Sequence, residues 1–409
     1  MHWGLCALVI LGLKCPGHTE VEPRHALAPP SVRPGLELLL SDSLHLIKGR
    51  RVGLVTNQSG VDHAGKSGVD RLLEAGVRVT ALFSPEHGFR GTADPGVAVQ
   101  STTDPVTGLP IYSLYGRNSA PTDSMLADID LLLVDLQDAG ARYYTYLWTT
   151  VEVMRAGGRR HLPVMVLDRP NPIGGLVQGN ILDTAFRTPV GLIAIPMRHG
   201  MTLGELARLA RHDFGLTTEL SVVPVAGWKR AQYFDDTALP FVPPSPNLQS
   251  VEALIHYPGT CLFEGTTLSV GRGTDHAFEQ VGAPWLDTAR VLKELRGAPL
   301  PGVAFRSVTF TPVKPGDGKF ADTLVSGIRL QVTDRKRYDP TVTALYLLQA
   351  VSRSGGPLFT ADHRHLQRLL AEPLNDGLFA SGNWATLAAG WASARASFLE
   401  RRKPFLLDY

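Results

Sequence analysis

Short apolar runs alternate with helical patterns through the first half of the chain. Apolar residues have helical spacing at Val69 to Glu74 and Leu147 to Arg155, and Thr202 with Glu205 forms a capping-box pattern before a further helix. Runs such as Leu131-Leu132-Leu133-Val134 are apolar at every position, which indicates strands buried on both faces, as in parallel sheets covered by helices. The pattern predicts an α/β fold with a mostly parallel sheet, whose strands are expected at Val52 to Thr56, Val77 to Phe83, Ile129 to Leu136, Leu162 to Leu167 and Ser221 to Val225.

The second half of the chain has a different pattern. The stretch Phe241 to Asn247 contains too many prolines for a helix or a central strand. Beyond it, strand-like runs occur at Val303 to Phe310 and Gly327 to Val332, and helical patterns at Ala344 to Val351 and Leu366 to Leu370. We therefore predict two domains, residues 36–255 and an α+β domain over residues 256–409.

Polar side chains follow the predicted strands at their carboxyl ends. The heptad Ser84-Pro85-Glu86-His87-Gly88-Phe89-Arg90 places a carboxylate, an imidazole and a guanidinium directly after the second strand. An isolated Glu-His pair is more often a structural contact than a catalytic pair. Here, however, several polar loops converge, since parallel strands end at the same edge of a sheet. The other strands are followed by Asn57, Gln58 and Ser59, by Asp135, Gln137, Asp138, Arg142, Tyr143, Tyr144 and Tyr146, and by Asp168, Arg169 and Asn171.

Composition narrows the classes of protein that fit. The chain has 409 residues, of which 44% are hydrophobic and 19% charged, so it can bury a large core. The net charge is only +2 and no basic stripe is present, so a nucleic-acid partner is not expected. The three cysteines, Cys6, Cys15 and Cys261, form neither a disulfide framework nor a metal-binding pattern.

The N-terminus resembles a secretory signal. The apolar stretch Trp3 to Leu13 is too short to span a bilayer but has the length of a signal-peptide core. No Lys or Arg precedes it, and the cleavage-like triplet Ala26-Leu27-Ala28 lies far downstream. We expect residues 1–28 to be a leader that directs the protein to the periplasm or the exterior, without a stable membrane span. If the stretch is not a signal, a cytoplasmic location is expected.

One motif points to another class of enzyme. Residues Gly60-Val61-Asp62-His63-Ala64-Gly65-Lys66-Ser67 fit the phosphate-binding loop of nucleotide hydrolases, in which backbone amides and a lysine hold phosphates. In such loops the first glycine follows the strand almost directly, whereas Asn57, Gln58 and Ser59 intervene here. A nucleotide hydrolase is therefore an alternative that the spacing disfavours.

A series of short motifs runs in order from about Arg51 to the C-terminus. The motifs are Gly53-Leu54-Val55-Thr56-Asn57, Phe83-Ser84-Pro85-Glu86-His87-Gly88, Asp135-Leu136-Gln137-Asp138, Arg142-Tyr143-Tyr144-Thr145-Tyr146, Leu167-Asp168-Arg169-Pro170-Asn171-Pro172, Arg198-His199-Gly200-Met201-Thr202, Pro243-Pro244-Ser245-Pro246-Asn247, Tyr257-Pro258-Gly259-Thr260, Leu262-Phe263-Glu264-Gly265-Thr266 and Ser269-Val270-Gly271-Arg272-Gly273. Together they resemble those of the NamZ family of bacterial exo-β-N-acetylmuramidases. The resemblance implies a Rossmann-like N-terminal domain, a smaller C-terminal domain, an active site in the cleft between them, and release of N-acetylmuramic acid from the non-reducing end of peptidoglycan fragments.

Cleavage of a glycosidic bond needs an acid for the leaving oxygen and a group that handles the cationic sugar. We expect Glu86 to be the acid, with His87 bonded to it or to the sugar. The second group is a carboxylate, for which Asp138 and Glu264 are the candidates, or the acetamido group of the substrate. Either carboxylate has an ion pair with a nearby arginine as its ordinary alternative. A third hypothesis is a non-catalytic protein that binds cell-wall sugars.

Muramic acid carries a lactyl carboxylate, which an arginine can bind through two parallel hydrogen bonds. Arg272, between two glycines, is the preferred anchor, with Arg90 and Arg142 behind it. The remaining candidates for sugar binding, which have turn or core roles as alternatives, are Tyr144, Asn57, Asn171 and Asp168. The histidines are scattered without zinc-site spacing, so no metal and no cofactor is expected, and muramyl saccharides from peptidoglycan are the expected partners.

Overall fold

The five predicted strands lie in one seven-stranded sheet in the computed structural model, which describes residues 1–2, 32–94, 96–98, 100–359 and 363–409. The two strands that the sequence did not predict, β3 and β4, are at one edge of this sheet. All neighbouring strands are parallel except the edge pair β3–β4. The mostly parallel sheet that the sequence predicts is thus confirmed. Its order is β3 (Thr102–Thr103), β4 (Pro110–Ser113), β2 (Arg78–Ser84), β1 (Arg51–Thr56), β5 (Leu131–Asp135), β6 (Val164–Leu167) and β9 (Leu220–Val223).

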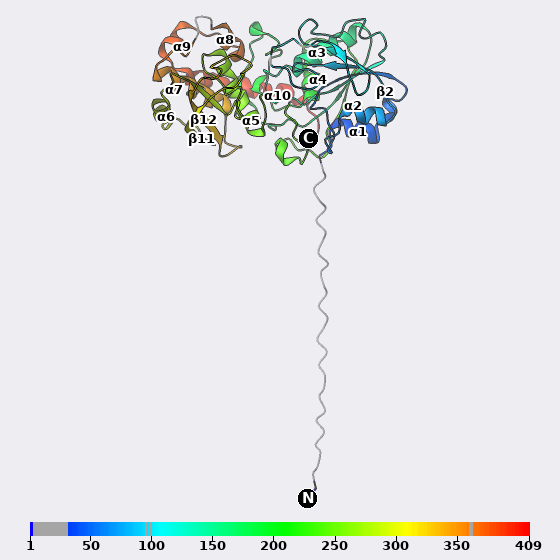
Figure 1. The fold of residues 1–409 in the computed structure, drawn as a ribbon, viewed down its shortest axis with the longest axis horizontal. Helices are drawn as coiled ribbons and strands as arrows, with labels where there is room; N and C mark the ends of the chain where they lie inside the picture. Colours follow the sequence, from blue (N-terminus) through cyan, green and yellow to red (C-terminus); the bar gives the residue numbers. More distant parts are fainter. Residues whose placement is uncertain (3–31, 95, 99, 360–362) are drawn as a thin grey trace. The chain divides into compact units, whose positions relative to one another are not determined.

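The centre of this sheet is buried on both faces, because alternate residues of β5 and of β6 belong to different core clusters. In β5, Leu131 and Leu133 pack on one face and Leu132 and Val134 on the other. The first face is covered by α1 (Gly35–Asp42) and α2 (Gly68–Glu74), and the second by α3 (Tyr146–Arg159) and α4 (Leu203–Asp213). Figure 1 shows α1 and α2 together on one side of the sheet. The capping box of α4 is present, with Thr202 and Glu205 bonded reciprocally.

The register of the sheet brings the polar loops together. Val52 pairs with Leu131 and Thr56 with Asp135, so β1 and β5 end level with each other. On the other side of β1, Val55 pairs with Phe83, one residue before the end of β2. The loops that leave β1, β2 and β5 therefore start at one edge, where open parallel sheets bind their ligands.

The second half of the chain forms an antiparallel sheet with helices. Its three strands have the order β10 (Gln280–Ala283), β12 (Val325–Val332) and β11 (Val303–Phe310). Figure 1 shows β11 and β12 beside α6 (Thr288–Leu295) and α7 (Pro340–Ser354). The remaining elements are a hairpin of β7 (Gln178–Ile181) with β8 (Pro196–Arg198), and the helices α5 (Val251–Thr260), α8 (Arg364–Leu370), α9 (Asp376–Ser381) and α10 (Trp391–Arg402).

The two halves are closely joined. Residues 31–409 form one compact unit, and a single core cluster contains α3 and α4 residues together with Tyr257, Phe263 and Leu345. Helix α5 runs across residue 255, so the predicted boundary falls inside a helix and stays a prediction. The predicted leader, residues 1–28, lies almost entirely outside the described residues. Within the part that the structure describes, no helix is long and apolar enough to cross a membrane.

The loop that mimics a phosphate site is closed on itself. The Asp62 carboxylate accepts hydrogen bonds from the backbone N–H groups of Ala64 (2.9 Å) and Lys66 (2.8 Å). The Lys66 ammonium pairs with Glu74 at the surface. Arg169 binds Asp135, the last residue of β5, at 2.6 and 3.0 Å. A carboxylate of the protein therefore occupies the donors that a phosphate would need, and the nucleotide alternative receives no support.

Candidate active site

A cavity of about 100 Å³ lies where the loop after β2 meets the second half of the chain. It contains two carboxylates, Glu86 from the first half and Glu264 from the second. An active site between the two halves of the chain was expected from the sequence, and residues of both halves line this cavity. The residues around it are Glu86, His87, Tyr143, Tyr144, Thr145, Val190, Ser245, Leu248, Tyr257, Glu264, Arg272 and Phe278.

Glu86 is held at the positive end of helix α3. Thr145 precedes this helix as its N-cap, yet its hydroxyl makes no capping bond and instead donates to Glu86 Oε2 at 2.6 Å. The backbone N–H of Gly96 donates to Oε1 at 2.9 Å. The Tyr115 hydroxyl is a third partner, and burial together with the Glu86 carboxylate raises the pKa of Tyr115 to about 12. The carboxyl group is only 8% exposed and its orientation is fixed by these contacts.

His87 is strained and oriented. Its backbone has φ of +71°, a left-handed conformation that is uncommon outside glycine and is found at functional sites. Its Nδ1 lies 2.8 Å from the carbonyl oxygen of Ala93, which can only accept, so Nδ1 carries the proton and Nε2 is the acceptor. Burial lowers the pKa of His87, and Arg272 lowers it further against the opposing effect of Glu86. The imidazole is therefore neutral at neutral pH.

Glu264 forms an ion pair with Arg272. Its Oε1 accepts from Arg272 Nε at 2.8 Å and from Nη2 at 2.5 Å. The guanidinium stacks over the Phe278 ring, 5.0 Å from its centroid. Burial alone would lower the pKa of Arg272, but the Glu264 carboxylate outweighs this effect and the pKa is raised. The third nitrogen, Nη1, is buried and has no hydrogen-bond partner among the described residues. An unpaired charged donor at a cavity is a position where a ligand oxygen can bind.

The segment that carries Glu264 is locked by a buried lysine. Lys319 Nζ donates to four backbone carbonyl oxygens, those of Thr266 (2.8 Å), Leu268 (2.9 Å), Glu264 (3.2 Å) and Phe263 (3.4 Å). Burial lowers the pKa of Lys319, whereas nearby Asp317 and Glu264 raise it. The ammonium group thus ties the short helix Cys261–Gly265 to the loop that follows it.

The proline-rich stretch forms one wall of the site. The hydroxyls of Tyr144 and Tyr146 both donate to the carbonyl oxygen of Pro244, at 2.6 and 3.0 Å. Asn57, predicted to bind sugar, instead donates to the Tyr146 hydroxyl at 2.5 Å and accepts from Ser59. These contacts place Ser245 and Leu248 at the cavity, so the stretch predicted only as a domain boundary contributes to the site.

Asp138 does not line the cavity. It is buried, and its Oδ2 accepts from the backbone N–H of Gly140 at 2.7 Å and lies 3.3 Å from His199 Nε2. His199 Nδ1 in turn accepts from the Met201 N–H, so the ring proton is on Nε2 and points at the carboxylate. Of the two candidates for the second carboxylate, only Glu264 is a cavity residue.

Three further residues that were predicted to bind the sugar instead make hydrogen bonds within the protein. Asp168 accepts from the hydroxyls of Thr202 (2.6 Å) and Tyr409 (2.7 Å), and burial raises its pKa to about 6. Arg142 donates to the carbonyl oxygens of Leu369 and Leu370 in α8. Their positions, and that of Asn171, which donates to the Met201 carbonyl, give no support to sugar binding.

Arg90 lines a neighbouring cavity, not that of Glu86. It is largely exposed and donates to the buried Asp104 at 3.0 Å. The residues that sequence reasoning missed at the Glu86 cavity are Thr145, Val190, Ser245, Leu248, Tyr257 and Phe278, whereas Tyr143 is one of the polar residues that it places after a strand. Thr145 had a signal, because it stands between tyrosines in a strand-end motif, whereas Val190, Leu248 and Phe278 look like ordinary core residues.

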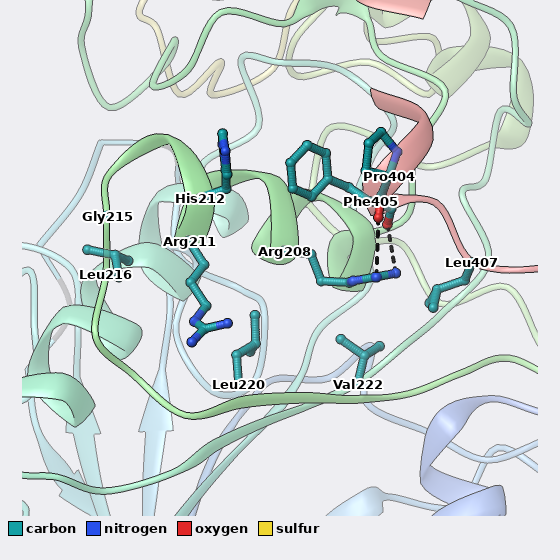
Figure 2. A pocket seen from close by; sticks show the side chains of 10 residues that line it. All are labelled: Arg208, Arg211, His212, Gly215, Leu216, Leu220, Val222, Pro404, Phe405 and Leu407. Carbon is teal, nitrogen blue, oxygen red and sulfur yellow. Dashed lines mark hydrogen bonds between the residues drawn. The ribbon is translucent and has the colours of Figure 1, made fainter. Parts of the chain in front are cut away.

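A larger cavity of about 610 Å³ lies between α4 and the C-terminal tail (Figure 2). There Arg208 donates to the carbonyl oxygens of Phe405 (3.0 Å) and Pro404 (3.4 Å). None of the described residues that line it is an Asp or a Glu, so it lacks the carboxylate pair that most glycoside hydrolases use. Over the described ranges, no three His, Cys, Asp or Glu side chains gather closely enough to hold a metal ion.

Comparison with known proteins gives the same family for both halves of the chain. Residues 52–252 match the family model "Exo-beta-N-acetylmuramidase NamZ, N-terminal", and residues 255–408 match the model of its C-terminal part. A curated relative, the peptidoglycan beta-N-acetylmuramidase NamZ of Bacillus subtilis, is 46% identical over 324 residues, which cover 79% of this chain and 78% of that protein.

Two crystal structures share the fold. Both are DUF1343 family proteins from Bacteroides fragilis, one 30% identical with a TM-score of 0.84 and one 31% identical with a TM-score of 0.72. The first covers 93% of this chain and 99% of its own, and the second 92% and 98%. The similarity therefore extends over both halves of the molecule.

Proposed function

The chain belongs to the NamZ family of exo-β-N-acetylmuramidases, and on this premise we propose that it hydrolyses the bond that joins a non-reducing terminal N-acetylmuramic acid to the next sugar of a peptidoglycan fragment. The observation that carries the proposal is the pair of carboxylates, Glu86 and Glu264, at one cavity. Glycoside hydrolases of most families work with two such groups.

In the proposed reaction, Glu86 gives its proton to the leaving glycosidic oxygen as the bond from that oxygen to the anomeric carbon breaks. A water molecule supplies the hydroxyl group that the anomeric carbon gains, and its remaining proton restores Glu86. Glu264, held by Arg272, faces the positive charge that develops on the sugar ring. The neutral His87 is available to accept a hydrogen bond from a sugar hydroxyl through Nε2.

Arg272 is proposed to select muramic acid. Its Nη1 is a buried donor without a partner in the described structure, next to a cavity that holds both carboxylates. The lactyl carboxylate of the substrate would satisfy this donor, and a sugar without that group would leave it unpaired. In this proposal, Arg272 distinguishes muramic acid from sugars without a lactyl group, and the reaction uses no cofactor.

Product analysis tests the function. The purified protein is incubated with MurNAc-GlcNAc and with the reversed disaccharide GlcNAc-MurNAc, and the products are identified by mass spectrometry. We expect free MurNAc and GlcNAc from the first substrate and no cleavage of the second, because only the first has a non-reducing muramic acid. Binding of MurNAc-GlcNAc without products would instead support a non-catalytic sugar-binding protein.

We also propose that the protein is exported from the cytoplasm. The Trp3 to Leu13 stretch supports export to the periplasm or the exterior, where peptidoglycan fragments are found. N-terminal sequencing of the protein purified from its native cells tests this: a mature start near residue 29 is expected, and an intact Met1 in the cytoplasmic fraction would contradict it.

A further inference from the structure

A second cavity, about 510 Å³ in volume, lies at the loop that follows β2. His87 lines both this cavity and the smaller one that holds Glu86 and Glu264. Its walls come from the end of β2, the loop after it and the edge strands β3 and β4, and include Ser84, Phe89, Arg90 and Thr102. We call it the outer cavity. Because His87 lines both spaces, a molecule in the outer cavity would contact the residue that directly follows Glu86.

The outer cavity contains an unpaired buried hydroxyl. Ser84 is 1% exposed, and its Oγ has no hydrogen-bond partner among the residues that the structure describes. A buried hydroxyl without a partner destabilises the folded protein, and at a cavity wall a bound ligand can supply the missing hydrogen bond. This serine directly precedes Pro85 and Glu86, so a bond to it would fix a ligand relative to the acid.

The remaining lining is neutral and suits a sugar. Arg90 and Asp104 form an ion pair at 3.0 Å, so their charges cancel. Thr92 and Thr102 add hydroxyl groups, and the half-buried Phe89 adds an apolar surface. Hydroxyl donors and acceptors beside an aromatic ring match a pyranose, which has polar edges and apolar faces. Among the described residues that line this cavity, an anionic ligand would find no unpaired cation.

We propose that the outer cavity binds the neutral amino sugar on the leaving-group side of the scissile bond. The inference rests on the proposed function, since it assigns the terminal muramic acid to the Glu86 cavity. An exo-acting hydrolase must hold the leaving sugar next to its proton donor. The outer cavity meets this need because His87, the residue after Glu86, forms its wall.

A third cavity of about 590 Å³ is the competing location. It lies near Arg117, Asn118 and Thr122 and shares no lining residue with the Glu86 cavity. A ligand there would be separated from His87. A substitution in this third cavity therefore serves as the control for adding a bulky side chain near the site.

The test compares two substrates that differ only in the leaving group, MurNAc-GlcNAc and a nitrophenyl β-muramide. For Ser84→Ala we expect kcat/KM on the disaccharide to fall about fivefold, with at most about half that loss on the aryl substrate, and no decrease in Tm because the lost hydroxyl was unpaired. Thr149→Val is the matched control: it also removes a buried hydroxyl without a described partner, but in α3. Its ratio of the two kcat/KM values is expected to equal that of the wild type.

Thr102→Trp, which fills the outer cavity, is expected to reduce disaccharide cleavage at least about tenfold more than aryl cleavage. Asn118→Trp adds the same bulk in the third cavity and is expected to leave the ratio unchanged. Equal loss on both substrates in Ser84→Ala and Thr102→Trp, or a selective loss in Asn118→Trp, would overturn the inference. If Thr102→Trp does not fold, Ser84→Ala decides alone. A wild-type protein that cleaves neither substrate would instead refute the proposed function.

Discussion

Several single residues at the site depart from the hydrogen bonds or backbone conformation that would best stabilise the fold. Thr145 gives its hydroxyl to Glu86 although it occupies a helix N-cap, where it would ordinarily stabilise α3 by about 1 kcal/mol. His87 has a left-handed backbone, and Arg272 leaves Nη1 unpaired. Such departures from local preference are typical of functional sites.

Arg272→Lys tests substrate selection. A lysine can keep a charge near Glu264 but cannot bond Glu264 and a second carboxylate with a planar fork. We expect kcat/KM on a nitrophenyl β-muramide to fall on the order of tenfold or more, while the low activity on the matching glucosaminide, which lacks the lactyl group, changes less. Equal losses on both sugars would contradict a role in lactyl recognition.

Among the elements of the fold, the loops that form the site are held by hydrogen bonds from residues in other parts of the chain. Lys319 supplies a cation to four carbonyl oxygens around Glu264, and the tyrosines after β5 hold the proline-rich stretch through Pro244. A buried ammonium with several carbonyl partners is stabilising only while all its donors are satisfied. The segment that presents Glu264 should therefore respond strongly to changes at residue 319.

Lys319→Ala is expected to lower the free energy of unfolding by on the order of 1–3 kcal/mol and to lower kcat more than it raises KM, because four carbonyls lose their donor and Glu264 loses its position. Ammonium chloride should restore part of the activity by entering the vacated space, whereas choline chloride at equal ionic strength should not. Activity that is unchanged by the substitution, or equally restored by choline, would contradict the positioning role.

At the scale of the whole molecule, the chain returns to its first half after building the second. Arg402 at the end of α10 donates to the carbonyl oxygens of His199 and Gly200, and the Tyr409 hydroxyl donates to Asp168 under the large sheet. The C-terminal residues thus fasten the two halves that together enclose the Glu86 cavity. This closure makes Asp168 a reporter of the assembled fold.

Asp168→Asn tests that fastening through its pH dependence. The folded-state pKa of about 6 lies above the ordinary 3.8, so the folded protein binds a proton between these values that the unfolded chain does not. As the pH falls from 7 to 4, the wild type should gain on the order of 2 kcal/mol relative to the variant. Denaturant unfolding at both pH values measures this, with the exposed Asp42→Asn as control. A constant difference would contradict the buried acid.

The sheet was predictable because its strands are apolar on both faces, so residues such as Leu131 to Val134 reveal them without tertiary information. The site was less so. Glu86, Asp168 and Arg142 have the same sequence signal, a polar residue after a buried strand. What separates them are partners at Tyr409 and Leu369, more than 200 residues away. Local patterns carry no information on such pairings.

Glu86 is the proposed proton donor, at a cavity that it shares with Glu264. Glu86→Gln keeps the volume of the side chain and can still bond Thr145 or Gly96, but it cannot transfer a proton. Turnover and affinity for MurNAc-GlcNAc are measured on the same preparation. We predict that kcat falls by about a hundredfold to ten-thousandfold while the Kd from calorimetry stays within about threefold of the wild type. A variant with wild-type kcat would exclude Glu86 as the proton donor.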